Sequence, residues 1–204
     1  MQEIAPGIHH WTAYRDTIGA DVHSYFHVPS RTLIDPMVPP EGMDALGTEP
    51  ERIVLTNRHH YRDSERFGCP VLCHESGLHE FRDGRAVEGF AFGDELAPGV
   101  TALEVGVLTP EETAVHLAGD GGGALAFADC VVRGRHGELG FVSDFLLGDD
   151  PRAIRDGLRA AFRRLCDTVE FDSLLLAHGD PIAHGGRLAL RTFADAPTAG
   201  APPA

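Results

Sequence analysis

Hydrophobic and polar residues alternate along the first third of the chain in short runs that predict β-strands. Runs of this kind cover 7–13, 24–28 and 31–34, and turn-forming residues separate them. A further apolar run at 52–56 leads directly into a dense cluster of polar residues, 57–63. Sites in α/β proteins commonly lie where a strand ends in polar side chains. The pattern therefore predicts a strand meander, then a strand that delivers a candidate site loop.

The second part of the chain continues the alternation and then changes period. Strands are expected at 70–72, 91–92, 100–107, 114–117, 125–128 and 171–177, with short helices at 42–46 and 75–81. After Asp149 the apolar residues recur at helical spacing, from Ile154 to Leu165. Asp150 can cap such a helix and Pro151 suits its first position. The spacing therefore predicts a long amphipathic helix that begins at Pro151.

The chain has 204 residues, enough for one domain to bury roughly 70% of its unfolded surface without disulfides or metals. No Pro-, Gly- or Ser-rich linker interrupts residues 1–193, which we interpret as a single domain. Residues 194–204 are rich in Ala, Pro and Gly, and we expect them to form a flexible C-terminal tail.

The net charge and the type of basic residue exclude several kinds of chemistry and binding partner. The formal net charge is −14, and all 17 basic residues are Arg, so Schiff-base lysine chemistry and Walker-type phosphate loops are excluded. An acidic chain without a basic patch disfavours binding to nucleic acid or to anionic membranes, and no run approaches the roughly 20 apolar residues of a membrane span. We expect a cytoplasmic protein whose partner is a small-molecule ligand or substrate, and the sequence leaves a homodimer open.

Cysteine and histidine offer one local zinc pattern. Cys69, Cys73, His74 and His79 form a CxxxCHxxxxH string. Its spacing fits no compact zinc knuckle, and the two Cys bracket an expected strand that turns their side chains to mismatched faces. We interpret the four scattered Cys as mostly buried thiols in a reducing compartment.

Three expected strand ends carry metal-binding residue types. His59 and His60 follow the strand at 52–56, Asp129 follows 125–128, and His178 follows 171–177. Imidazole and carboxylate ligands together suit zinc, iron or manganese. The structural alternative is that the histidines are loop residues, that Asp129 caps a turn and that His178 packs beneath Gly179.

The order of these segments resembles that of the metallo-β-lactamase superfamily across residues 4–190. Four segments carry the resemblance: Leu33-Ile34-Asp35, Val54-Leu55-Thr56, Leu125–Asp129 and Leu175–Asp180. The resemblance implies a four-layer αββα sandwich of the α/β (α+β) class, with its site along one sheet edge. It also implies that Asp35 orients the metal loop through backbone hydrogen bonds.

The metal loop of that family, Thr-His-x-His-x-Asp-His, falls here on the segment from Thr56 to Arg62. Only its second His is kept, as His59, while Asn57, Tyr61 and Arg62 stand at the other three ligand positions. A further family ligand would fall within 107–112, where no His is present. The resemblance thus leaves His59, Asp129 and His178 as metal ligands in a depleted site.

Two interpretations follow. In the first, His59, Asp129 and His178 hold one zinc, iron or manganese ion, and the protein is a metal-dependent hydrolase of an ester, lactone or thioester-like carbonyl. His60, Asp63 or Asp180 would then supply a fourth ligand or a general base.

In the second interpretation no metal is bound. Arg62 takes the place of a cation and forms a salt bridge with Asp129, which preserves the fold without a metal. The protein would then be a non-catalytic ligand- or protein-binding module.

Overall fold

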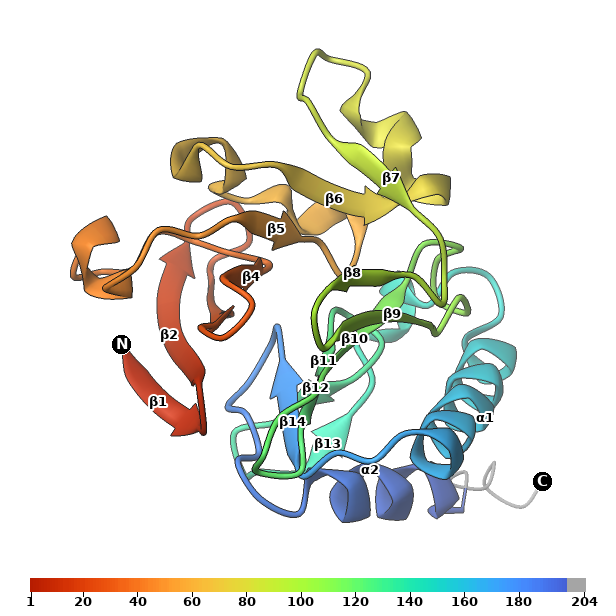
Figure 1. Ribbon diagram of the computed structural model, residues 1–204. Helices are drawn as coiled ribbons and strands as arrows, with labels where there is room; N and C mark the ends of the chain where they lie inside the picture. The colour runs from red at the N-terminus through yellow and green to blue at the C-terminus, as the bar shows by residue number, and fades with distance from the viewer. Residues whose placement is uncertain (198–204) are drawn as a thin grey trace.

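Two β-sheets form the centre of the molecule, and the computed structural model describes residues 1–197 (Figure 1). The first sheet has seven strands in sequential order. They are β1 (Gln2–Ala5), β2 (Ile8–Arg15), β3 (Ala20–His27), β4 (Thr32–Ile34), β5 (Arg52–Val54), β6 (Val71–His74) and β7 (Glu88–Phe90). Strands β1 to β4 pair antiparallel, whereas β4 to β7 pair parallel.

The second sheet has five strands in the order β14-β11-β10-β9-β8. They are β8 (Glu95–Ala97), β9 (Val100–Glu104), β10 (Thr113–Leu117), β11 (Ala124–Phe127) and β14 (Ser173–Leu176). Only the β11–β14 pair is parallel, and its register places Phe127 opposite Leu176. A separate two-stranded ribbon joins β12 (Val132–Arg133) to β13 (Leu139–Gly140).

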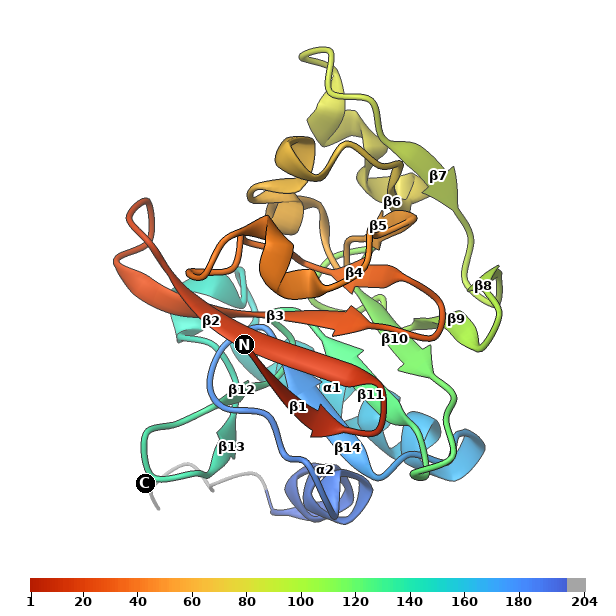
Figure 2. The same cartoon turned by 60° about the vertical axis from the view of Figure 1, so that its left-hand side comes forward.

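Helices cover the outer face of the second sheet. α1 (Pro151–Thr168) and α2 (Gly186–Asp195) pack there, and Phe162 of α1 meets Phe127 of β11 edge-on. On the first sheet the outer layer consists of 3-10 turns within the described chain: η1 (Met43–Leu46), η2 (Arg58–Tyr61), η3 (Ser64–Phe67) and η4 (Glu75–Phe81). Another 3-10 turn, η5 (Asp144–Leu146), precedes α1. Figure 2 shows the resulting layers, with the two sheets between the turns and the helices.

Three apolar clusters fill the spaces between these layers. The middle one lies between the sheets around Tyr25, Ile34 and Leu175. The second joins the helices to their sheet, and the third lies beneath the 3-10 turns around Trp11 and Phe67. The layered arrangement confirms the expected αββα sandwich.

Most predicted elements are present, with local differences. Asp150 caps α1 by accepting a hydrogen bond from the backbone N–H of Ala153, and Pro151 opens the helix as expected. The strand expected at 91–92 lies slightly earlier, as β7. The helix α2 was not predicted and runs to Asp195, two residues into the expected tail, because buried Ala194 anchors its last turn. Residues 198–204 of that predicted tail lie outside the described residues.

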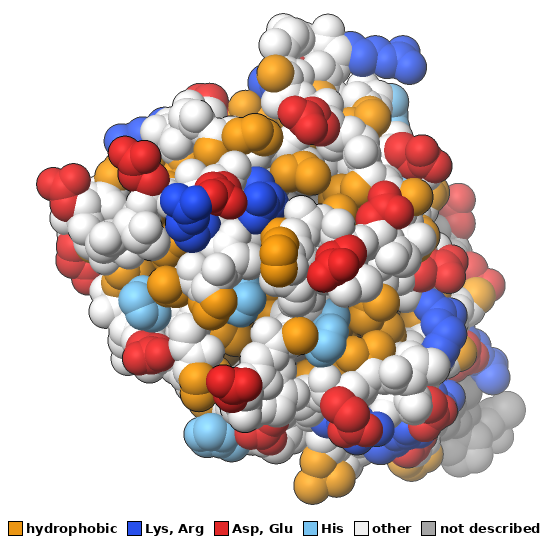
Figure 3. All heavy atoms as spheres, in the orientation of Figure 1, with side chains coloured by type: hydrophobic (Ala, Val, Ile, Leu, Met, Phe, Trp, Pro, Cys, Tyr) orange, Lys and Arg blue, Asp and Glu red, His pale blue; other side chains and the backbone are white. Residues whose placement is uncertain are grey.

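Acidic side chains are spread over the face of the molecule shown in Figure 3. In the described part of the chain no helix has the length and apolar character needed to cross a membrane.

Candidate metal centre

Asp129 and His178 meet because β11 and β14 are parallel neighbours. Phe127 and Leu176 are paired in register, so Asp129 and His178 each follow a paired position by two residues at the same end of the sheet. The Nε2 atom of His178 lies 3.1 Å from Oδ1 of Asp129. These two expected site residues are thus brought together by strand pairing.

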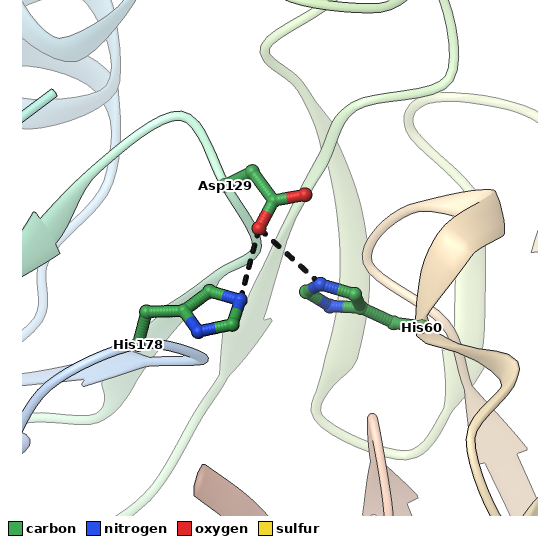
Figure 4. Close-up of side chains that lie close together, drawn as sticks. All are labelled: His60, Asp129 and His178. Atoms are coloured by element: carbon green, nitrogen blue, oxygen red, sulfur yellow. Dashed lines mark ion pairs between the residues drawn. The ribbon is translucent and has the colours of Figure 1, made fainter. Parts of the chain in front are cut away.

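The third member of the cluster is His60, not the expected His59. Nε2 of His60 lies 3.3 Å from the same Oδ1 of Asp129 (Figure 4). The backbone turns into η2 after Asn57, whose side chain accepts a hydrogen bond from the N–H of His59. In this turn His60 is buried, whereas His59 is exposed on the wall of the cleft. The cluster therefore contains His60 at the place where His59 was expected.

Asp35 fixes the orientation of His60. Its Oδ2 lies 2.8 Å from Nδ1 of His60, and its Oδ1 accepts a hydrogen bond of 2.8 Å from the backbone N–H of Thr56. A carboxylate only accepts hydrogen bonds, so Nδ1 of His60 is the donor and Nε2 points toward Asp129. The backbone contact to Thr56 is the supporting role that the resemblance implied for Asp35.

Asn57 fixes the other side of the cluster. Its Nδ2 donates to Oδ2 of Asp129 at 3.0 Å, which leaves Oδ1 to face the two imidazoles. The same Nδ2 lies 3.3 Å from Oε2 of Glu112, and Oε1 of Glu112 accepts from the backbone N–H of Cys130. A residue at a lost ligand position thus holds the remaining carboxylate in place.

Sequence reasoning missed Glu111 and Glu112, which lie buried behind this site. Glu111 forms an ion pair with Arg58, and Glu112 supports Asn57 and Cys130. Two adjacent acids before a strand are typical of an exposed turn, so the sequence carried no signal for their burial.

The expected Arg62–Asp129 salt bridge is not among the ion pairs of residues 1–197. The Nη1 of Arg62 donates instead to the backbone carbonyl oxygens of His23, at 2.8 Å, and Asp35, at 2.6 Å. Arg62 has a left-handed backbone conformation, with φ of 47°. This conformation carries its side chain toward β3 and the end of β4, away from the carboxylate.

The other expected candidates for a general base do not reach the cluster. Asp63 accepts a hydrogen bond from the backbone N–H of Val38 at 2.9 Å and does not line the cleft. Asp180 lines a separate pocket beside His23 and the 133–137 turn. Cys73 is buried and His74 stacks on Phe92, so the Cys/His string forms no ligand group in the described chain.

The charged groups of the cluster shift one another's pKa values. Burial alone would lower the pKa of His60, but Asp35 and Asp129 raise that pKa to about 9. Burial would raise the pKa of Asp129, whereas His60 and His178 hold it far below the usual aspartate value. Burial, reinforced by Asp129, raises the pKa of Glu112 to about 7. The two imidazoles thus keep the carboxylate of Asp129 ionised.

The donor set fits one metal ion. One ligand atom from each of His60, Asp129 and His178 lies within 4.8 Å of the others, and two imidazoles with one carboxylate suit zinc or iron. A carboxylate on the far nitrogen of a ligating His, as Asp35 is on His60, is the usual support for such a ligand. The site opens into a cleft of about 740 Å³.

Comparison with known proteins identifies the fold. No model of a known protein family matches the chain, and no curated protein matches its sequence. Among solved structures, a metallo-beta-lactamase family protein from Thermus thermophilus is similar at a TM-score of 0.65 and 17% identity, over 95% of this chain and 78% of that one.

Two further solved structures are similar to this chain over most of their length. A metallo-beta-lactamase from Erythrobacter litoralis, with beta-mercaptoethanol in its active site, has a TM-score of 0.64 and 14% identity, over 95% of both chains. The protein TTHA1623, solved in a di-iron-bound form, has a TM-score of 0.65 and 21% identity, over 90% of this chain and 99% of that one. At these identities the likeness establishes the fold.

Proposed function

From the metallo-β-lactamase fold of this chain, we propose that it is a metal-dependent hydrolase with a mononuclear centre held by His60, Asp129 and His178. The observation that carries the proposal is the convergence of both Nε2 atoms on Oδ1 of Asp129. The di-iron form of TTHA1623 supports it, because a protein of this fold binds metal. The ion is zinc, iron or manganese, by the chemistry of the ligands.

The chain's own residues prepare the site for an ion. Asp35 holds the tautomer of His60 that presents Nε2, and Asn57 holds Asp129 so that Oδ1 faces the same point. When bound, a divalent ion with an open position supplies a water molecule of lowered pKa and polarises a carbonyl group. The proposed substrates are therefore carbonyl compounds with a labile bond: an ester, a lactone or a thioester.

A second candidate is a binding module without metal, and one observation favours it. The pKa of about 9 keeps His60 protonated near neutrality, so a proton between His60 and Asp129 satisfies the cluster without an ion. In this form the cleft binds a ligand or a protein and catalyses no hydrolysis.

Metal analysis separates the two candidates. The wild-type protein, His178→Ala and His59→Ala would be purified without added metal, incubated with Zn²⁺, Fe²⁺ or Mn²⁺, desalted and analysed by mass spectrometry of the elements. His59 is the matched control, since it is a neighbouring histidine outside the cluster. We expect about one equivalent in wild type and His59→Ala, and none in His178→Ala.

If the wild type holds no metal after all three incubations, the proposal of a metal-dependent hydrolase is wrong and the proposal of a binding module without metal is supported. An equal amount of bound metal in all three proteins would show that His178 is not a ligand, contrary to the assignment. Hydrolysis of p-nitrophenyl and thioester substrates by the loaded wild type, lost in His178→Ala, completes the test.

A further inference from the structure

The rim of the cleft is apolar and exposed. Ile18, Phe145 and Leu146 line it, with exposed fractions of 53%, 81% and 53%. Ile18 comes from the β2–β3 turn, while Phe145 and Leu146 come from η5, so segments far apart in sequence supply one apolar rim. Large apolar side chains left exposed around a cleft indicate that an apolar ligand covers them.

The same cleft is also lined by basic side chains. Arg15, Arg58, Arg62 and Arg85 line it. Arg58 is neutralised by Glu111, and Arg85 by Asp83. In the described chain neither Arg15 nor Arg62 has a carboxylate partner within ion-pair distance. Two carboxylates also line the cleft: Asp129, which is already engaged by the two imidazoles, and Glu80, which forms no ion pair with Arg15 or Arg62.

The hydrogen bonds of these two arginines leave donors unused. Arg15 donates from Nε to the hydroxyl of Thr17 at 2.9 Å. Arg62 uses Nη1 for the carbonyls of His23 and Asp35, while its Nε and Nη2 atoms are buried without a partner. A buried donor without a partner costs free energy that an anionic acceptor would recover.

The charges of Arg15 and Arg62 also favour an anionic ligand. Two guanidinium groups that line one cleft repel each other, and neither loses its proton at physiological pH. In a chain of net charge −14, two guanidinium groups without a carboxylate partner form a local concentration of positive charge. An anion bound between them removes the repulsion.

We propose that the cleft binds an amphiphilic anion, whose carboxylate or phosphate group lies at Arg15 and Arg62 and whose hydrocarbon part lies on Ile18, Phe145 and Leu146. The anion subsite stands without the metal, whereas its role in presenting a reacting carbonyl rests on the proposed function. The substrate class then narrows to anionic esters or thioesters with an apolar chain or ring.

Binding of simple probes tests the subsite. Octanoate, octyl phosphate and the neutral octanamide would be titrated by calorimetry into the protein as purified and after treatment with a chelator. Arg15→Ala is the principal variant, because the side chain of Arg62 also holds two backbone carbonyls and its loss could disturb folding. Arg152→Ala is the matched control, since this arginine is 85% exposed on α1.

We expect octanoate to bind about tenfold more tightly than octanamide, and Arg15→Ala to lose about tenfold in affinity for octanoate. Arg152→Ala should retain the wild-type affinity. Octyl phosphate that binds more tightly than octanoate would identify a phosphate as the anion, and the reverse order a carboxylate. Equal binding of octanoate and octanamide, equal affinities of the two variants, or no binding of any probe would overturn the proposal.

The apolar rim has its own variant. Phe145→Ala should weaken octanoate binding several-fold, whereas Leu188→Ala, which removes a side chain 72% exposed on α2, should not. If Phe145→Ala instead converts a dimer to a monomer in sedimentation velocity, the rim is a contact between copies and the proposal fails. Metal content measured on the same samples keeps the tests apart, because anion binding that persists after chelation supports the subsite even if no metal is found.

Discussion

Asp35 determines how His60 is presented at the cluster. It occupies a left-handed backbone conformation, with φ of 46°, which is costly for a residue other than glycine. From this position its carboxylate reaches both the backbone of Thr56 and Nδ1 of His60, and it also accepts from the Thr56 hydroxyl. Local strain is therefore found where a carboxylate must contact both the site loop and a site side chain.

Replacing Asp35 by Asn tests this role. The amide has no charge and cannot accept from all three donors at once, so the imidazole of His60 loses its fixed orientation. We expect metal affinity to fall about 10- to 100-fold, as for other supporting residues of metal ligands. Competition of Zn²⁺ against a chromophoric chelator measures the affinity.

Asp63→Asn provides the control for Asp35→Asn, because the carboxylate of Asp63 also accepts a backbone hydrogen bond, from the N–H of Val38, but lies outside the cleft. Equal affinities of the two variants would remove Asp35 from the metal site.

The raised pKa of His60 predicts a pH dependence of stability in the metal-free protein. Folding raises this pKa from 6.5 to about 9, so the folded state holds the proton more tightly than the unfolded state. The stabilisation is complete below pH 6.5 and is lost as the pH rises toward 9. Urea unfolding in the presence of a chelator, at about pH 6.5 and about pH 8.5, should show a decrease in the free energy of unfolding.

The variant His60→Gln isolates this contribution, since it lacks the titrating group but keeps a polar side chain. Its free energy of unfolding should change less between the two pH values. A decrease as large as that of the wild type would assign the effect to other groups.

At the scale of elements, the ends of paired strands position two site residues and a short turn positions the third. The strand ends before Asp129 and His178 could be predicted from apolar runs, because such runs end where the chain leaves the buried sheet. Which histidine of η2 is buried could not, because η2 places adjacent side chains on different sides of the turn. A match to a family motif, position by position, therefore selected His59 where the turn presents His60.

The turn after β14 depends on Gly179. This residue has a φ of +88°, and a Cβ added to it would lie 2.1 Å from the carbonyl oxygen of Arg133. The close approach allows the N–H of Arg133 to donate to the carbonyl of His178 at 3.0 Å. The glycine thus lets the β12 segment pack directly against the backbone that carries His178.

Gly179→Ala should therefore disturb both stability and the site. We expect a loss of about 2–3 kcal/mol in the free energy of unfolding, from the steric clash and the unfavourable φ. Thermal and urea unfolding measure the stability, and metal content reports on His178. Gly119→Ala is the control, because no heavy atom lies within 4 Å of its added Cβ, and we expect it to be nearly neutral. A fully stable Gly179→Ala protein would contradict this account of the turn.

At the scale of the whole molecule, direct hydrogen bonds join the two sheets near the site. The hydroxyl of Tyr25, on β3, donates to the carbonyl of Leu176 at 2.7 Å and accepts from its N–H at 2.9 Å. The backbone N–H of His23 also donates to the carbonyl of Ala177 at 3.0 Å. These bonds connect β3 of the first sheet to the end of β14, next to His178.

Removing the Tyr25 hydroxyl should weaken this connection. In Tyr25→Phe two buried backbone groups of Leu176 lose their partner, and we expect a loss of about 1–3 kcal/mol in the free energy of unfolding. Tyr14→Phe is the control, since Tyr14 is 59% exposed and its hydroxyl should contribute little. Equal stability of the two variants in urea unfolding would show that the hydroxyl does not hold the sheets together.

The sequence by itself determined most of the strands, the capped helix α1 and the strand ends that carry Asp129 and His178, but not the short strands β1, β8, β12 and β13. Burial and backbone hydrogen bonding impose these features over short stretches, so their periodicity is visible in the residues. The sandwich was expected only from the resemblance in segment order to the metallo-β-lactamase superfamily.

Only the tertiary structure decided the details of the site. The choice of His60 over His59 depends on the turn at η2, and the contact with Asp35 comes from a separate strand end. Arg62 binds two backbone carbonyls instead of Asp129 because its left-handed backbone turns the side chain away. Such outcomes depend on loop dihedral angles and on which remote segment packs nearby, and neither leaves a periodic signal in the sequence.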